Sequence, residues 1–187
     1  MTRPFKRLIL VVSTLLLSPV LSLVGFYAWV HFAGNFHEVA RHQVYRSGQL
    51  NATELAHRTQ EVGLKSILNL RGENPDAPWY QEEILAAKAL GLLHMDVSLS
   101  ASTPVNTEQL KAILQLIDSA PKPLLIHCTD GADRSGLVSA VYLLRAGENT
   151  AKAKEQLSWR FGHFPHLLWT FTRAMDQSLA LYLSESP

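Results

Sequence analysis

The stretch LLIHCTDGADRSGLVSA, residues 124–140, decides the fold class. It begins with an apolar run that is typical of a strand buried on both faces of a sheet, and the only cysteine of the chain, Cys128, ends that run. Glycines, aspartates and an arginine follow, and a helix pattern begins near Arg134. This order is typical of α/β proteins, in which ligands bind where the carboxyl ends of strands lead into helices.

The loop after Cys128 has the composition of an anion-binding site. Gly131 allows a backbone with positive φ, and Gly136 allows the next helix to pack closely on the sheet. A loop this tight turns successive N–H groups inward ahead of a helix N-terminus, which suits phosphoryl oxygens and favours a thiolate over a thiol. Arg134 can bind two phosphate oxygens through its planar guanidinium group. We therefore expect phosphoryl transfer through a cysteinyl-phosphate on Cys128.

Two other interpretations of this cysteine explain less. A buried structural cysteine would not require the glycines and the arginine that follow it. A metal site formed by His127 and Cys128 is excluded because adjacent residues of a strand point to opposite faces. We expect neither a metal nor a cofactor.

The remaining sequence alternates between strand and helix patterns. Strands are expected within VYRSGQL, KSILNL, LHMDVSL and PLLIHC, and helices from about 134 to 145, 150 to 159 and 166 to 183. Capping boxes at Asn51 with Glu54 and at Asn106 with Gln109 predict two further helix starts. The alternation predicts an α/β fold, a three-layer sandwich with a small, mainly parallel central sheet flanked by helices.

The N-terminal part predicts one transmembrane helix ahead of this domain. Residues 8–30 carry no charge and, at ~1.5 Å per residue, are long enough for the ~30 Å core of a bilayer. Residues 1–7 contain Arg3, Lys6 and Arg7, which predict a cytoplasmic N-terminus, a single-pass anchor in the inner (cytoplasmic) membrane and a periplasmic or otherwise exported domain. A cleaved signal sequence is the alternative. We expect residues 31–43 to be a linker and residues 44–187 to be the catalytic domain.

The charge balance excludes a nucleic-acid-binding protein. Three of the 17 lysines and arginines lie in residues 1–7, which leaves 14 against 16 aspartates and glutamates in the rest of the chain. The exported domain is therefore not basic overall, so we expect no nucleic acid among its partners.

The segment HCTDGADRS, residues 127–135, resembles the H-C-x5-R-[ST] signature of the cysteine-dependent protein tyrosine phosphatase superfamily. From Val44 on, the chain resembles its compact dual-specificity branch in a bacterial form, to which VYRSGQL and ILNLRGE are also similar. The resemblance implies that Cys128 is the nucleophile, that Ser135 donates to the sulfur and helps it leave, and that His127 orders the loop through hydrogen bonds. It also implies a phosphate-binding loop of Thr129, Asp130, Gly131, Ala132, Asp133 and Arg134.

The general acid departs from the usual pattern of this superfamily. The loop SASTPVN, where many members carry an aspartate, contains no carboxylate. The spacing C-x-D-G-x-D-R resembles the loop of myotubularin-type lipid phosphatases, which implies that Asp133 is the acid, with Asp96 as the alternative. For Asp130 we expect a turn-forming role at least as much as a chemical one.

Four further side chains are open to two interpretations. Arg71 either faces the substrate or forms a surface ion pair, and Trp79 either lines the approach to the site or packs in the core. His163 and His166 have no chemical context in the sequence, so we expect surface or helix-capping roles for them.

The sequence thus predicts a phosphoric monoester hydrolase, most simply a protein tyrosine or dual-specificity phosphatase acting on a phosphorylated protein. Two alternatives stay open. One is a phosphoinositide or inositol-phosphate phosphatase, and the other is a pseudophosphatase module that binds phosphate without hydrolysing it.

Overall fold

The computed structural model describes residues 15, 17–18, 21–22, 24–25, 34–166 and 170–185. The chain divides into two compact units, residues 1–33 and residues 34–187. The membrane helix expected over residues 8–30 lies mostly outside the described residues. Within the ranges given above, no helix combines the length and the apolar character that a membrane span requires.

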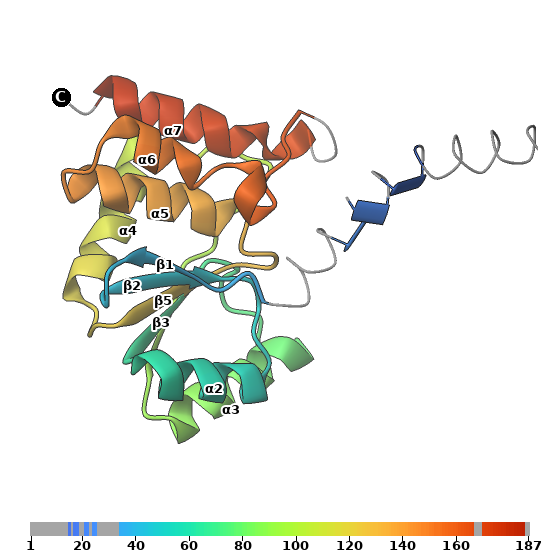
Figure 1. The fold of residues 1–187 in the computed structure, drawn as a ribbon. Helices are drawn as coiled ribbons and strands as arrows, with labels where there is room; N and C mark the ends of the chain where they lie inside the picture. The colour runs from blue at the N-terminus through green and yellow to red at the C-terminus, as the bar shows by residue number, and fades with distance from the viewer. Residues whose placement is uncertain are drawn as a thin grey trace, which may run out of the picture. The chain divides into compact units, whose positions relative to one another are not determined.

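The second unit is built on a five-stranded sheet in the order β1-β2-β5-β3-β4 (Figure 1). The strands are short, and they are β1 (His37–Ala40), β2 (Val44–Ser47), β3 (Ser66–Asn69), β4 (Leu93–Asp96) and β5 (Leu124–His127). β1 runs antiparallel to β2, and all other neighbours are parallel. The expected mainly parallel sheet is confirmed.

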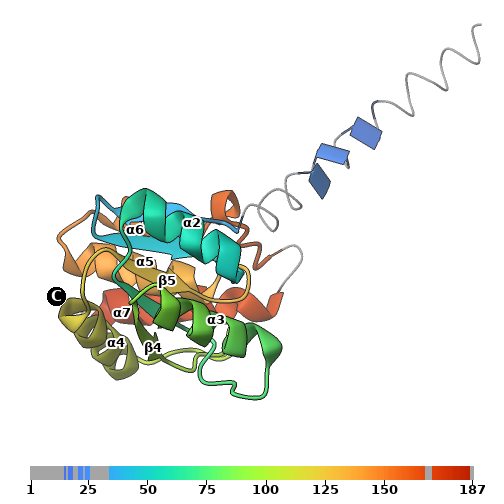
Figure 2. The same ribbon diagram turned by 90° about the horizontal axis from the view of Figure 1, so that it is seen from below.

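Helices cover both faces of the sheet, so the expected three-layer arrangement is confirmed. α2 (Ala52–Val62) and α3 (Pro78–Ala89) cover one face, the face toward the viewer in Figure 2. The other face carries α4 (Thr107–Ser119), α5 (Arg134–Arg145), α6 (Thr150–Glu155) and α7 (Arg173–Glu185). Side chains of β5 alternate between these layers, since Leu124 and Ile126 belong to the core beneath α4, α5 and α7, and Leu125 to the core beneath α2 and α3.

Both predicted capping boxes are present. Asn51 accepts a hydrogen bond from the amide of Glu54, whose carboxylate accepts one from the amide of Asn51, each at 2.9 Å. Asn106 and Gln109 make the same reciprocal pair at the start of α4. These bonds satisfy amides that the first turn of a helix leaves free, so the starts of α2 and α4 follow from local sequence.

Three expectations require correction. Residues 37–40, expected in a linker, form β1 and pair with β2, so the domain includes residues from Gly34 on. The helix expected from 150 to 159 ends at Glu155, and a separate 3-10 turn η1 (Trp159–Phe161) follows, ended by Gly162 at φ 83°. The last helix begins at Arg173 instead of residue 166, after the short 3-10 turn η2 (Thr170–Thr172).

Candidate active site

Cys128 lies at the carboxyl end of β5, the central strand. β5 pairs with β2 on one side and β3 on the other, and the amide of Cys128 donates to the carbonyl of Ser47 at the end of β2 (3.4 Å). Its side chain is buried. The next residues form a loop, and α5 begins at Arg134, so the expected strand, loop and helix are found.

A buried arginine on β2 holds the loop from behind. Nη2 of Arg46 donates to the carbonyls of Gly131 (2.6 Å) and Ala132 (3.0 Å), and Nη1 donates to the backbone and side-chain oxygens of Gln156. The guanidinium group also lies 4.4 Å from the ring centroid of Phe161. Burial lowers the pKa of Arg46 to about 10, so the group remains charged at neutral pH. No local sequence pattern points to this residue.

The first two carbonyls of the loop also accept hydrogen bonds from residues outside the loop. The carbonyl of Thr129 accepts from the amide of Gln49, and that of Asp130 accepts from Nδ2 of Asn35, both at 2.9 Å. Together with Arg46, these donors bind the carbonyls of residues 129–132. Because the C=O and the N–H of a trans peptide point in opposite directions, the amides of residues 130–133 are directed to the other side, as in an anion-binding nest.

The two glycines of the loop are required by close contacts. Gly131 has φ +72°, and a Cβ there would lie 2.4 Å from the amide nitrogen of Gly48 and 2.5 Å from the carbonyl carbon of Ser47. A Cβ on Gly136 would lie 2.7 Å from the carbonyl oxygen of Gln156. Gly136 thus allows close packing against the segment after α6, whereas the sequence suggested packing against the sheet.

Arg134 bridges three neighbouring loops. Its Nη2 donates to Oγ1 of Thr129 (2.8 Å), and its Nη1 lies within hydrogen-bond distance of the carbonyls of Leu99 (3.2 Å) and Leu70 (3.4 Å). The Nε is buried and has no hydrogen-bond partner within the described part of the chain. These contacts hold the guanidinium group over the carboxyl ends of β3, β4 and β5.

Ser135 lies where a donor to the cysteine sulfur is expected. Its hydroxyl oxygen is 3.5 Å from Sγ of Cys128, and the serine is fully buried in the first turn of α5. The geometry suits the role that the signature implies.

His127 faces a buried carboxylate. Its Nε2 lies 3.2 Å from Oε1 of Glu83 without hydrogen-bond geometry, and Nδ1 has no partner in the residues that the structure describes. The expected hydrogen bonds from His127 to the loop are therefore not found there. Glu83 also contacts Nε2 of His94 (2.8 Å) and the side-chain amide of Gln49.

The charge of Glu83 follows from these neighbours. Burial alone would raise the pKa of this carboxyl, but the two histidines and the amide outweigh burial and lower the pKa to about 2. Glu83 is not among the residues predicted from the sequence, although the sequence contains a signal for it. The residue occupies the buried side of α3 one turn before Ala87, where a carboxylate needs a partner.

Asp96, the alternative acid, has partners on both oxygens. Oδ1 accepts from the side-chain amide of Asn69 (2.7 Å), and Oδ2 accepts from the hydroxyl of Tyr80 (2.8 Å) and lies 3.4 Å from Nδ1 of His94. The carboxylate thus belongs to a polar network between β3, α3 and β4.

Asp133 is paired with a buried histidine. Its Oδ1 lies 2.6 Å from Nδ1 of His163, and Nε2 of the same ring lies 3.2 Å from Oδ2 of Asp176. Burial would lower the pKa of His163, but the two carboxylates outweigh it and raise the pKa to about 9. The surface role expected for His163 is therefore wrong, since its side chain is 1% exposed.

Arg71 lies near the same rim as the loop. Its Nη1 donates to Oε1 of Gln49 (2.8 Å), and its guanidinium group is 3.4 Å from the ring centroid of Trp79. Burial and the charge of Arg134 lower the pKa of Arg71, whereas Cys128 acts in the opposite direction. Arg71 and Trp79 thus contact each other beside the loop, and the charge of Arg71 interacts with those of Arg134 and Cys128.

Comparisons with known proteins identify the family of the chain. The family model described as "DSP-PTPase phosphatase fused to NAD+ Kinase" matches residues 22–166. No curated protein matches the chain.

Solved structures show the same fold. TpbA of P. aeruginosa is 20% identical with a TM-score of 0.61, over 83% of this chain and 92% of that one. A cysteine-to-serine variant of TpbA in complex with phosphotyrosine gives 20% and 0.61, over 81% and 90%. The core catalytic domain of the PP-IP phosphatase SIW14 from S. cerevisiae gives 23% and 0.62, over 77% and 85%. Because the family model covers most of the chain, the protein belongs to the dual-specificity-type branch of the cysteine-dependent protein tyrosine phosphatases.

Proposed function

We propose that the protein hydrolyses phosphotyrosine in proteins, with phosphoserine and phosphothreonine as further substrates, through a cysteinyl-phosphate. One observation carries the proposal. The sulfur of Cys128 lies at the base of a loop in which the carbonyls of residues 129–132 all accept hydrogen bonds from residues outside the loop. The amides of the loop are therefore directed inward, and Arg134 lies beside the loop. This arrangement supplies a nucleophile and donors for the phosphoryl oxygens.

The steps follow from the positions of these groups. The thiolate of Cys128 attacks phosphorus, and the bond from phosphorus to the ester oxygen breaks as that oxygen takes a proton from the acid, Asp133 in this proposal. The inward amides and Arg134 stabilise the charge on the equatorial oxygens. Water then attacks the cysteinyl-phosphate, and the hydroxyl of Ser135, 3.5 Å from the sulfur, donates to the departing thiolate.

Hydrolysis of a phosphotyrosine peptide and of a simple aryl phosphate tests the proposal. Wild-type protein should release inorganic phosphate from both, and Cys128→Ser should release none while it still binds the peptide. Ser135→Ala should slow the second step and accumulate phosphoenzyme. If wild type and Cys128→Ser are equally inactive and both bind the peptide, the protein is a phosphate-binding module and the proposal fails.

A second candidate, an inositol-phosphate or phosphoinositide phosphatase, is favoured by Arg71. The charges of Arg71 and Arg134 are close enough to interact, and a second cation beside the phosphate-binding loop suits a substrate with a second phosphate group. The carboxylates of Asp130 and Asp133 in the loop oppose a highly charged substrate. A panel of phosphopeptides, inositol phosphates and phosphoinositides separates the two, since Arg71→Ala should raise KM for multiply phosphorylated substrates only.

We also propose that residues 8–30 anchor the protein in the cytoplasmic membrane with the catalytic domain exported. The uncharged stretch and the three cations before it support this topology. Fractionation of cells, followed by protease treatment of spheroplasts, tests it. The protein should sediment with membranes at its full length and be digested from the outside. A shortened protein in the soluble exported fraction would indicate a cleaved signal sequence instead.

A further inference from the structure

Three charged side chains from three parts of the fold meet beside the phosphate-binding loop. Asp133 precedes α5, His163 follows η1, and Asp176 lies in the first turn of α7. The ring of His163 lies between the two carboxylates, with one nitrogen 2.6 Å from Asp133 and the other 3.2 Å from Asp176. A carboxylate at each ring nitrogen favours the imidazolium form, because only that form can donate to both at once.

The surroundings of the ring favour the same protonation state. The charged groups that face His163 are Asp133 from the start of α5 and Asp176 from α7, and together they raise its pKa to about 9 against the effect of burial. Beyond them, the charge of Arg46 interacts with that of Asp133, and Lys154 of α6 lines the groove that contains Asp176. At neutral pH the three side chains of Asp133, His163 and Asp176 therefore hold one exchangeable proton, the one that makes the ring an imidazolium.

The pair formed by Asp133 and His163 is next to the reacting groups. Asp133 immediately precedes Arg134 in the chain, and both Cys128 and Asp133 interact electrostatically with Arg46, whose guanidinium group binds the carbonyls of Gly131 and Ala132. The side chain of Asp133 is 17% exposed, whereas that of His163 is 1% exposed. The carboxylate is thus more open to solvent than the ring that it contacts.

We propose that Asp133 and His163 act as one acid, in which His163 stores the proton that Asp133 delivers to the leaving group. The proposal rests on the phosphatase activity proposed above. Asp133 is the catalytic residue because it would contact the ester oxygen, and His163 is a positioning residue that acts through it. The proposal explains how a carboxylate that is bound to a histidine can still supply a proton, and why no acid is needed in the loop SASTPVN.

The proton balance closes within one turnover. When the thiolate of Cys128 displaces the ester oxygen, that oxygen takes a proton from the carboxyl of Asp133, and Asp133 takes the proton from Nδ1 of His163. The pair then consists of a carboxylate and a neutral imidazole. In the second step Asp133 takes a proton from the attacking water and returns it to His163, while the phosphorus–sulfur bond breaks and the thiolate is restored. Ester and water become alcohol and phosphate.

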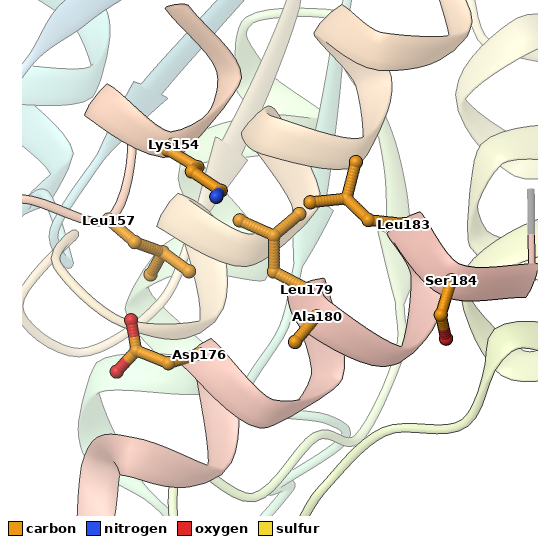
Figure 3. A pocket seen from close by; sticks show the side chains of 7 residues that line it. All are labelled: Lys154, Leu157, Asp176, Leu179, Ala180, Leu183 and Ser184. Carbon is orange, nitrogen blue, oxygen red and sulfur yellow. The ribbon is translucent and has the colours of Figure 1, made fainter. Parts of the chain in front are cut away.

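Asp176 sets how tightly the stored proton is held. Its carboxylate lines a cavity of about 600 Å³ between α6 and α7, where Figure 3 shows it on α7 near Leu157. Its side chain is 42% exposed and the ring it contacts is buried, so it can be changed with little effect on packing. Removal of its charge should weaken the hold of His163 on the proton without moving the ring from Asp133.

The test compares aryl phosphates whose leaving groups range from strongly to weakly acidic, using the full-length protein. A good leaving group departs without a proton, whereas a poor one needs the acid. His163→Gln should lower kcat/KM by about 100-fold or more for the poorest leaving group and by less than about threefold for the best one. Asp133→Asn should give the same pattern, and the double variant should be no worse than either, since the two act as one unit. His57→Gln, an exposed histidine of α2, is the matched control.

The pH profile supplies a readout that a structural role would not change. With a poor leaving group, wild-type activity should fall as pH rises through about 9, where His163 loses its proton. Asp176→Asn should move that fall to lower pH, and this variant serves even if His163→Gln does not fold.

Two outcomes would overturn the proposal without touching the phosphatase activity. One is an equal loss on good and poor leaving groups in His163→Gln, and the other is an unchanged profile in Asp176→Asn. If the wild-type protein fails on the best leaving group, the proposed function itself is wrong.

Discussion

Arg46 contacts the loop from a fully buried position on β2. Replacing it by methionine keeps much of its volume but leaves the carbonyls of Gly131 and Ala132 without a donor inside the protein. Because a buried acceptor without a partner costs about 1–3 kcal/mol, we expect Arg46→Met to lower the free energy of unfolding by about 2–4 kcal/mol, with a loss of kcat as the loop changes shape. Urea unfolding and aryl phosphate hydrolysis measure both effects.

Arg58 offers a matched control for this substitution. The guanidinium group of Arg58 lies 4.6 Å from the ring centroid of Phe36, just as the guanidinium group of Arg46 lies near the ring of Phe161. Arg58 also forms an ion pair with Glu61, and this ion pair is open to solvent. We expect Arg58→Met to cost about 1 kcal/mol or less and to leave kcat unchanged. Equal losses in both variants would mean that the carbonyl contacts of Arg46 do not matter for the loop.

Gly131 tests how closely the loop must approach β2. In Gly131→Ala the new methyl group would overlap the backbone of Ser47 and Gly48, and φ +72° would also be strained, so activity should be lost together with stability. Gly63→Ala has nearly the same φ, +70°, and nothing within 4 Å of the added carbon. We expect a cost of about 1–2 kcal/mol from the backbone alone in Gly63→Ala, and clearly more in Gly131→Ala, measured by thermal unfolding.

The residues that the sequence identified and those it missed differ in one physical respect. Cys128, Arg134 and Ser135 lie within eight positions, and their spacing around a tight turn can be recognised in the sequence itself. Arg46 is 85 positions from Gly131, and His163 is 30 positions from Asp133. Such partners become neighbours only when the sheet and the last helices assemble. No local sequence pattern therefore predicts these contacts.

α3 contributes one carboxylate that connects it to β4 and β5. The pKa of Glu83 is lowered to about 2 from an ordinary value of 4.5, so its ionised form stabilises the folded state. This contribution is complete above about pH 4.5 and is lost as pH falls toward 2, and a shift of this size corresponds to about 3 kcal/mol. We expect Glu83→Gln to be less stable than wild type near neutrality and to approach it near pH 2.

Urea unfolding between pH 2 and 7 checks this expectation. Glu108→Gln on α4 is the control, because that side chain is 86% exposed and should change stability by less than about 0.5 kcal/mol at any pH. A constant difference between Glu83→Gln and wild type across this range would show that the histidines do not hold Glu83 ionised.

At the scale of helices and strands, the elements with a strong local signal were predicted well, and those without one were not. The starts of α2 and α4 follow from capping boxes, and β5 follows from a continuous apolar run. β1 has no such signal. Its four residues, His37–Ala40, mix polar and apolar side chains, and they form a strand because the free edge of β2 is available for pairing. The apolar pattern around η2 likewise failed to predict where α7 begins, because 3-10 turns interrupt it.

The boundary of the catalytic domain is a prediction for the whole molecule. β1 pairs with β2, the strand that carries Arg46, and Nδ2 of Asn35 donates to the carbonyls of Asp130 (2.9 Å) and Phe161 (2.8 Å). A protein that starts at Gly34 keeps all of these contacts. It should unfold cooperatively and retain aryl phosphatase activity within about twofold of the full chain, since no contact described above within residues 34–187 requires residues 1–33.

A protein that starts at Val44 instead removes β1 and Asn35. The edge of β2 is then open to pairing with other chains, and the carbonyl of Asp130 loses its donor, so the amide of the same peptide is no longer held toward the phosphate. We expect aggregation and a loss of kcat of about tenfold or more, because one unpaired group of this kind costs about 1–3 kcal/mol. Circular dichroism, light scattering and phosphate release distinguish the two truncations. Equal activity of both would place β1 outside the catalytic unit and return the boundary to residue 44.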